Sequence, residues 1–240
     1  MERRPHLRYI LAIMSNSKST LGLDPALDTR GSGKQSGADE PLFLKKTPGK
    51  RPAASRRSQK THRAVLAAAE ELLKEIGYAG ITIDRIAERS GVAKASIYRW
   101  WPNKAAVLME LYIAIVRQAG MPIDTGTLES DLREHSRAAF RLFRNTVAGL
   151  ALAGFVAEAQ SNPETHKLLR EGIAADIRKI NVTLLERARA RGELNPWTST
   201  AVVADVMSGA LYYHLLIRRG PFTNAEADQI TDLILRSIRA

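Results

Sequence analysis

A short helix-turn-helix pattern restricts the fold of this chain more than any other feature of its sequence. Residues 82–104 read TIDRIAERSGVAKASIYRWWPNK, in which Thr82 is a favourable N-cap and Gly91 can adopt the positive φ of a tight turn. Ala87 is small enough for a close helix crossing, and the apolar residues that pack the second helix on the first are Val92 and Ile97. The pattern therefore predicts two short helices that cross closely.

Polar side chains distinguish this pattern from a helical hairpin in an ordinary core, which is the alternative. The side of the second helix that is not used for packing carries the donors Lys94, Ser96, Tyr98 and Arg99. Pro102 ends that helix, and Asn103 can cap the next one. Because a short helix with a row of donors fits the major groove of DNA, the segment predicts a DNA-binding domain.

Composition favours a helical protein and argues against several other classes. The chain has 240 residues, of which 45% are hydrophobic and only 6% aromatic, and it has no cysteine. Disulfides, thiol nucleophiles and thiolate metal sites are therefore excluded. No continuous apolar run approaches the length needed to span a bilayer, so we expect no membrane association and a cytoplasmic location. We find no glycine-rich phosphate loop, nucleophile elbow or paired His–carboxylate motif, so we expect neither an enzyme nor a bound metal or cofactor.

Positive charge is concentrated before the helix-turn-helix. Residues 1–60 carry 13 Lys or Arg and 5 Asp or Glu, a net of +8 out of the formal +11. We expect residues 1–55 to be a basic extension with little fixed structure, and Lys50 and Arg51 to follow DNA phosphates or enter the minor groove. A solvated, solubilising tail is the alternative, and translation could start at Met1 or at Met14.

The remaining sequence predicts helices only. Asn162–Pro163 is a strong helix start, and Thr223 with Glu226 forms a capping box. We see no strand signal, so the fold class is all-α with about nine helices. Beyond residues 82–101, they are expected near residues 59–76, 103–120, 128–145, 147–160, 162–191, 199–219 and 223–240.

At this point the sequence resembles the TetR family of transcriptional regulators. The resemblance covers residues 57 to about 115 and depends on the segments TIDRIA, GVAKASIY and WPNK within the pattern above. It implies a helix-turn-helix DNA-binding domain at residues 56–104 and a helical-bundle domain for dimerisation and ligand binding at residues 105–240. Family members are usually homodimers that bind DNA and a small ligand.

The resemblance also implies roles for individual residues. Thr82 and Lys104 would hold phosphates, and Tyr98 and Arg99 would contact phosphate or base. The recognition helix would begin with residues facing the base edges, which are Lys94, Ala95 and Ser96. Two positions depart from the family pattern: Ala95 stands where glycine is frequent, and Trp100–Trp101 replaces a His–Phe type of pair.

The second half contains two further candidate sites. The helix near residues 199–219 is apolar over much of its circumference, so with the last helix it predicts a four-helix dimer interface, at Val206, Gly209, Ala210, Tyr213, Ile230, Leu233 and Ile234. A single buried core helix is the alternative. The family leads us to expect a ligand pocket, with Phe140, Phe143, Phe155 and Leu169 as its candidate lining, although an ordinary core is the favoured interpretation for each of them. An arginine stripe on residues 133–144 is interpreted as a solvated face rather than an acidic-ligand site.

The resulting hypothesis is a one-component regulator, in which a homodimer represses transcription from a palindromic operator and a small molecule releases it. The alternative is an architectural or activating DNA-binding protein without small-molecule control. The roughly 120 residues that follow the DNA-binding region favour the first hypothesis.

Overall fold

The computed structural model describes residues 54–120 and 124–240. Most of the predicted basic extension, with Lys50 and Arg51, lies outside these residues. Within them the backbone is helical and contains no strand, apart from one isolated bridge between Leu194 and Arg239. The predicted all-α fold is confirmed.

The helix-turn-helix forms as its local signals predict. Helix α2 (Ala54–Gly80) precedes α3 (Ile83–Ser90) and α4 (Lys94–Tyr98). The Thr82 hydroxyl accepts a hydrogen bond from the Arg85 amide at 3.2 Å, and Gly91 ends α3 with φ of 66°. Helix α2 bends at Gly77, where the sequence predicts its end, and then continues to Gly80. The cap and the turn glycine therefore fix the position of α4.

Helix α5 (Lys104–Ala119) connects the DNA-binding domain to the rest of the molecule. The Asn103 side chain caps it by accepting from the Ala106 amide at 2.9 Å. Most of its residues are buried, because α5 packs against α2 on one side and against α7 (Ala148–Ala159) on another. The first turns of α5 thus lie in the same apolar core as α2 and α3.

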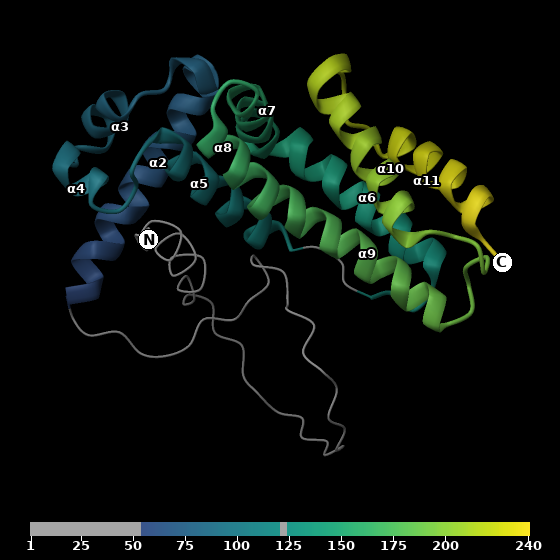
Figure 1. Ribbon diagram of the computed structural model, residues 1–240. Helices are drawn as coiled ribbons and strands as arrows, with labels where there is room; N and C mark the ends of the chain where they lie inside the picture. Colours follow the sequence, from purple (N-terminus) through teal and green to yellow (C-terminus); the bar gives the residue numbers. More distant parts are fainter. Residues whose placement is uncertain (1–53, 121–123) are drawn as a thin grey trace.

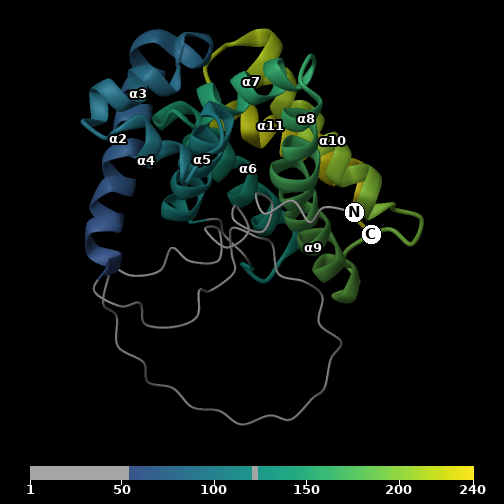
Figure 2. The ribbon, with the colours of Figure 1, turned by 60° about the vertical axis from the view of Figure 1, so that its left-hand side comes forward.

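The C-terminal domain is a bundle around α6 (Leu128–Asn145). After α7 the chain forms α8 (Pro163–Leu168), η1 (Leu169–Ala174) and α9 (Ala175–Ala190), followed by α10 (Thr200–Tyr213), η2 (His214–Arg218) and α11 (Asn224–Ile238). The helix predicted over 162–191 is continuous in space but contains the π-helical segment η1, which its apolar spacing does not reveal. Helices α3 and α4 lie at one end of the molecule and the α10–α11 pair at the other (Figures 1 and 2).

Arginines of α6 join that helix to α11. Arg137 donates from Nε and Nη2 to the two carboxylate oxygens of Asp228 at 2.8 and 2.9 Å. Arg133 donates to Asp232 at 2.9 Å, and Arg144 donates to the Phe222 carbonyl at 2.9 Å. The interpretation of this stripe as a solvated face is therefore wrong for Arg133 and Arg137, whose acidic partners on α11 are remote in sequence. Arg144 is exposed, as that interpretation expects.

Helix α10 with η2 is apolar yet largely uncovered. Residues Thr200–Arg218 form 19 residues that could cross a membrane by length and composition alone, and only 22% of that window is buried. The expectation that no apolar segment is long enough to span a bilayer is therefore wrong for this helix. A helix that packs against a protein partner can have the same length and apolar composition. These two properties therefore do not distinguish a membrane-spanning helix from one at a protein interface.

The contact between α2 and α7 leaves no room for a side chain at Gly154. A Cβ atom built there would lie 2.0 Å from Cγ of Tyr78, whose ring packs against Phe155 at a centroid distance of 5.5 Å. We therefore expect Gly154→Ala to lower the free energy of unfolding by about 1–3 kcal/mol in chemical denaturation.

The matched control uses a Tyr78→Ala background, where the same substitution meets no ring. There Gly154→Ala should be neutral or stabilising by up to about 1 kcal/mol, because alanine favours a helix over glycine. Equal destabilisation in both backgrounds would contradict this account of the contact.

Candidate nucleic-acid interface and ligand cavity

Helix α4 presents its polar side chains outward from a single buried anchor. Ile97 is fully buried, whereas Lys94, Ala95 and Arg99 are exposed, and Ser96 is partly exposed. Tyr98 is 54% exposed, so its ring does not act as a packing residue in the way the core alternative requires. The recognition-helix residues expected from the sequence therefore lie together on an accessible surface.

The start of α3 lies beside this surface. Thr82 is exposed at the N-terminus of α3, where the positive end of the helix dipole favours a phosphate. The Lys94 ammonium lies 2.7 Å from an Asp84 carboxylate oxygen, and both side chains are more than half exposed. This exposed ion pair is weak, so it leaves Lys94 able to exchange the carboxylate for another anion.

Both tryptophans contact the core, and Trp101 is the fully buried one. Trp101 is 1% exposed and donates from Nε1 to a Glu110 carboxylate oxygen at 2.7 Å. The other oxygen of Glu110 lies 2.7 Å from Nε2 of His62, whose ring lies 4.9 Å from that of Trp101. Trp101 is therefore a buried packing residue. His62 and Glu110 were missed from the sequence, since only the fold brings α2 and α5 together.

Lys104 occupies the junction between the two domains. Its ammonium donates to the Tyr78 carbonyl at 3.3 Å, lies 4.9 Å from the centre of the Tyr78 ring, and is 4.0 Å from a Glu158 carboxylate oxygen. Burial, with a smaller contribution from Glu158, raises the pKa of Tyr78 well above its usual value. Lys104 therefore lies close to the candidate DNA-binding surface. Glu158 of α7 would compete with a DNA phosphate for its ammonium group.

A cavity of about 80 Å³ lies in the C-terminal domain between α5, α6, α9, α10 and α11. Phe140 and Phe143 line it as expected, but Phe155 and Leu169 do not. Phe155 instead packs under Tyr78 at the domain junction, and Leu169 lies in η1 against the main core. The prediction of those two residues is incorrect because the cavity is closed by α10 and α11, which sequence reasoning assigned to dimerisation.

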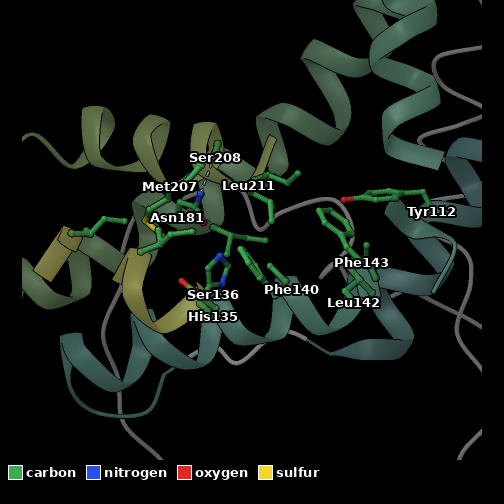
Figure 3. Close-up of a pocket in the computed structure, with 18 residues that line it drawn as sticks. Tyr112, His135, Ser136, Phe140, Leu142, Phe143, Asn181, Met207, Ser208 and Leu211 are labelled. Carbon is green, nitrogen blue, oxygen red and sulfur yellow. Dashed lines mark hydrogen bonds between the residues drawn. The ribbon is translucent and has the colours of Figure 1, made fainter. Parts of the chain in front are cut away.

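The cavity wall is apolar except for a small polar cluster. His135 and Phe140 of α6 face Asn181 of α9, and Ser208 of α10 lies beside Asn181 (Figure 3). Asn181 donates to the Ser208 hydroxyl at 3.3 Å. Burial lowers the pKa of His135, which keeps the imidazole neutral near pH 7.

Family comparisons agree with this arrangement. Residues 65–111 match the model of the bacterial regulatory proteins of the tetR family, and residues 122–234 match a tetracyclin repressor-like C-terminal domain. The chain is 31% identical over 182 residues to YdeS of Bacillus subtilis, an uncharacterized HTH-type transcriptional regulator, covering 76% of this chain and 87% of YdeS. The chain belongs to the TetR family of transcriptional regulators.

Solved structures of TetR-family proteins share the fold. The TetR-family regulator SCO0332 superposes with a TM-score of 0.60 at 31% identity, covering 74% of this chain and 97% of that one. FadR from Bacillus subtilis in complex with stearoyl-CoA gives a TM-score of 0.58 at 19% identity, over 72% of this chain and 97% of FadR. As a TetR-family member this protein is an HTH-type regulator, which is not a class of enzyme.

The residues predicted for the dimer interface of this TetR-family regulator divide into two groups. Val206, Gly209, Tyr213 and Leu233 are exposed. Ala210, Ile230 and Ile234 line the cavity, and Ile234 is buried. The second group faces the domain's own core, because α10 and α11 are apolar on two sides and periodicity does not say which side faces inward.

The competition for Lys104 can be tested through its carboxylate neighbour. If Lys104 contacts a phosphate, as the family resemblance implies, Glu158→Gln should tighten binding to DNA selected from random sequence by about two- to fivefold at low salt. Fluorescence anisotropy would measure the dissociation constants. Glu186→Gln, which removes the same charge near the distal end of α9, is the control, and an equal change in both variants would contradict a local effect.

Proposed function

We propose that this TetR-family regulator is a repressor that binds a near-palindromic operator as a homodimer and is released by a small molecule. The observation that carries DNA recognition is the surface of α4, where Tyr98, Arg99 and Lys94 are exposed around the buried anchor Ile97. Hydrogen-bond donors on a short exposed helix are suited to base edges and phosphates in the major groove.

A two-fold axis would give the operator its symmetry. One α4 helix spans only a few bases, so a single copy offers little sequence discrimination. In a dimer whose recognition helices lie about 34–36 Å apart, the two helices would enter successive major grooves on the same face of the DNA. Helices α10 and α11 lie at the end opposite α4, which leaves both DNA-binding ends accessible in such a dimer (Figure 1).

The outer face of α10 and α11 supports homodimerisation. Large apolar side chains are more than half exposed there, namely Val202, Val206, Tyr213, Ile217 and Leu233. An apolar patch of this kind on one surface favours a protein partner over water. The same patch on a second copy is self-complementary under two-fold symmetry, as a four-helix interface requires.

The cavity supports control by a small molecule. It is largely apolar with a few convergent polar groups, which is the usual character of a ligand site. FadR from Bacillus subtilis, a structural neighbour, was solved in complex with stearoyl-CoA. An architectural or activating protein without ligand control has no need of such a cavity.

Operator recognition can be tested by replacing exposed residues of α4. DNA sites would be selected from random sequence with the wild-type protein and then titrated with Tyr98→Ala and Arg99→Ala. We expect each substitution to cost about 1–3 kcal/mol of binding free energy while the melting temperature stays unchanged, since both residues are exposed. Arg170→Ala removes an exposed arginine from η1 and serves as the control. Unchanged binding by both α4 variants would refute the assignment.

Dimerisation can be tested by placing a charge on the outer face of α11. Leu233 is 71% exposed, so Leu233→Glu should fold normally yet shift the protein from dimer to monomer in analytical ultracentrifugation. Its operator affinity should fall at least about tenfold, because the two half-sites would no longer be bound together. Leu150→Glu on α7, an equally drastic change at a residue 50% exposed, is the control. A dimeric Leu233→Glu variant would contradict this interface.

A further inference from the structure

Two polar atoms in the cavity wall have no hydrogen-bond partner among the residues that the structure describes. They are Nδ1 of His135 and Oδ1 of Asn181. The two residues are only 8% and 2% exposed, and both line the cavity. Buried polar atoms are nearly always paired, so an unpaired donor or acceptor at a cavity wall indicates the position of a missing partner.

The hydrogen bonds that Asn181 makes to α10 use its amide nitrogen and not its oxygen. Asn181 donates through Nδ2 to the Ser208 hydroxyl at 3.3 Å, and Ser208 itself donates to the Ala204 carbonyl at 2.9 Å. This chain orients the amide, because Ser208 already uses its proton and must accept from Asn181. On the opposite wall, Ser136 is bonded to Thr231 at 3.1 Å. The acceptor Oδ1 of Asn181 is therefore left as the unsatisfied end of an ordered chain.

His135 can share one partner with Asn181. Burial lowers the pKa of His135, and a hydrogen-bonding interaction with the Asn181 side chain partly opposes that shift. The imidazole is therefore neutral, with one nitrogen that donates and one that accepts. A hydroxyl or an amide N–H placed between the two residues can donate to the Asn181 oxygen, and a hydroxyl oxygen can also pair with His135.

The charge of the cavity wall limits the ligand further. The 18 lining residues within the described part of the chain include no Lys, Arg, Asp or Glu. The arginines of α6 beside His135 are held by α11, Arg133 by Asp232 and Arg137 by Asp228. A carboxylate or ammonium group in this cavity would lose its hydration without gaining an opposite charge, which is unfavourable.

From these features we infer that the cavity takes an uncharged, mainly apolar ligand whose single hydroxyl or amide group binds between His135 and Asn181. The inference depends on the proposed small-molecule control and gives that ligand a chemical class. Phe140, Phe143 and Leu211 surround the apolar part of the ligand. The walls supply the affinity, and the His135–Asn181 pair selects the polar group.

Three probes of similar shape test this chemistry on the full chain. They are p-cresol with a hydroxyl, p-xylene with a methyl group in its place, and 4-methylbenzoate with a carboxylate. Titration calorimetry at pH 7 should show p-cresol binding at least about tenfold more tightly than p-xylene, because only p-cresol satisfies the buried acceptor. The carboxylate should bind more weakly than p-xylene.

Two variants assign the preference to these residues. Asn181→Leu and His135→Phe each remove one unsatisfied atom with little change in volume, and each should reduce the preference for p-cresol to about threefold or less while p-xylene still binds. Ser136→Ala is the matched control, since it removes a cavity hydroxyl that is already paired. That variant should keep the wild-type preference.

The outcomes separate the inference from the proposed function. Equal binding of p-cresol and p-xylene, or stronger binding of 4-methylbenzoate, would overturn the polar anchor while leaving ligand control intact. If no probe bound, the inference would be overturned together with this cavity as a site for small neutral ligands. The Tyr98 and Arg99 variants would still test operator recognition independently of these results.

Discussion

Helix α5 joins the two halves of the molecule, because it packs against α2 of the DNA-binding domain and against α7 of the C-terminal domain. Its start is fixed by the Asn103 cap and the buried Trp101, directly beneath the helix-turn-helix. Towards its other end, Tyr112 and Val116 line the cavity. A close-packed helix of this kind moves more readily as a rigid unit than by bending. Because one helix contacts both sites, a change in the cavity has a direct physical route to the support of α4.

A second contact holds the DNA-binding domain at a defined angle. The Tyr78 ring lies against Gly154 and Phe155 of α7, and Lys104 bonds to the Tyr78 carbonyl. The absence of a side chain at Gly154 allows α2 and α7 to approach this closely. Helix α2 is therefore held at two places, by α5 along its length and by α7 at its end. In the proposed dimer, these contacts would set the separation of the two recognition helices.

Features that depend on neighbouring residues could be predicted from the sequence. Features that depend on contacts with a distant segment of the chain were predicted wrongly. Thr82, Gly91, Asn103 and the Thr223–Glu226 capping box act within one turn, and the structure has each of them as predicted. The partners of the α6 arginines lie about 90 to 100 residues away, so a stripe that pairs with α11 was interpreted as solvated. Phe155 was assigned to the cavity because an apolar aromatic residue fits any core. The roles of the α4 side chains on DNA stay predictions, since they depend on a partner outside the chain.

The two apolar sides of α10 connect ligand binding to the proposed dimer. Met207 and Leu211 face the cavity, whereas Val206 and Tyr213 are exposed on the outer surface of the same helix. The two surfaces are thus separated by the thickness of one helix, and α11 repeats the pattern with Ile234 inside and Leu233 outside. A ligand that fills the cavity would contact the two helices that would also form the two-fold interface. In the proposed dimer, a shift of α10 would change the position of the partner copy, so occupancy of the cavity could alter the spacing of the recognition helices even though α4 does not line the cavity.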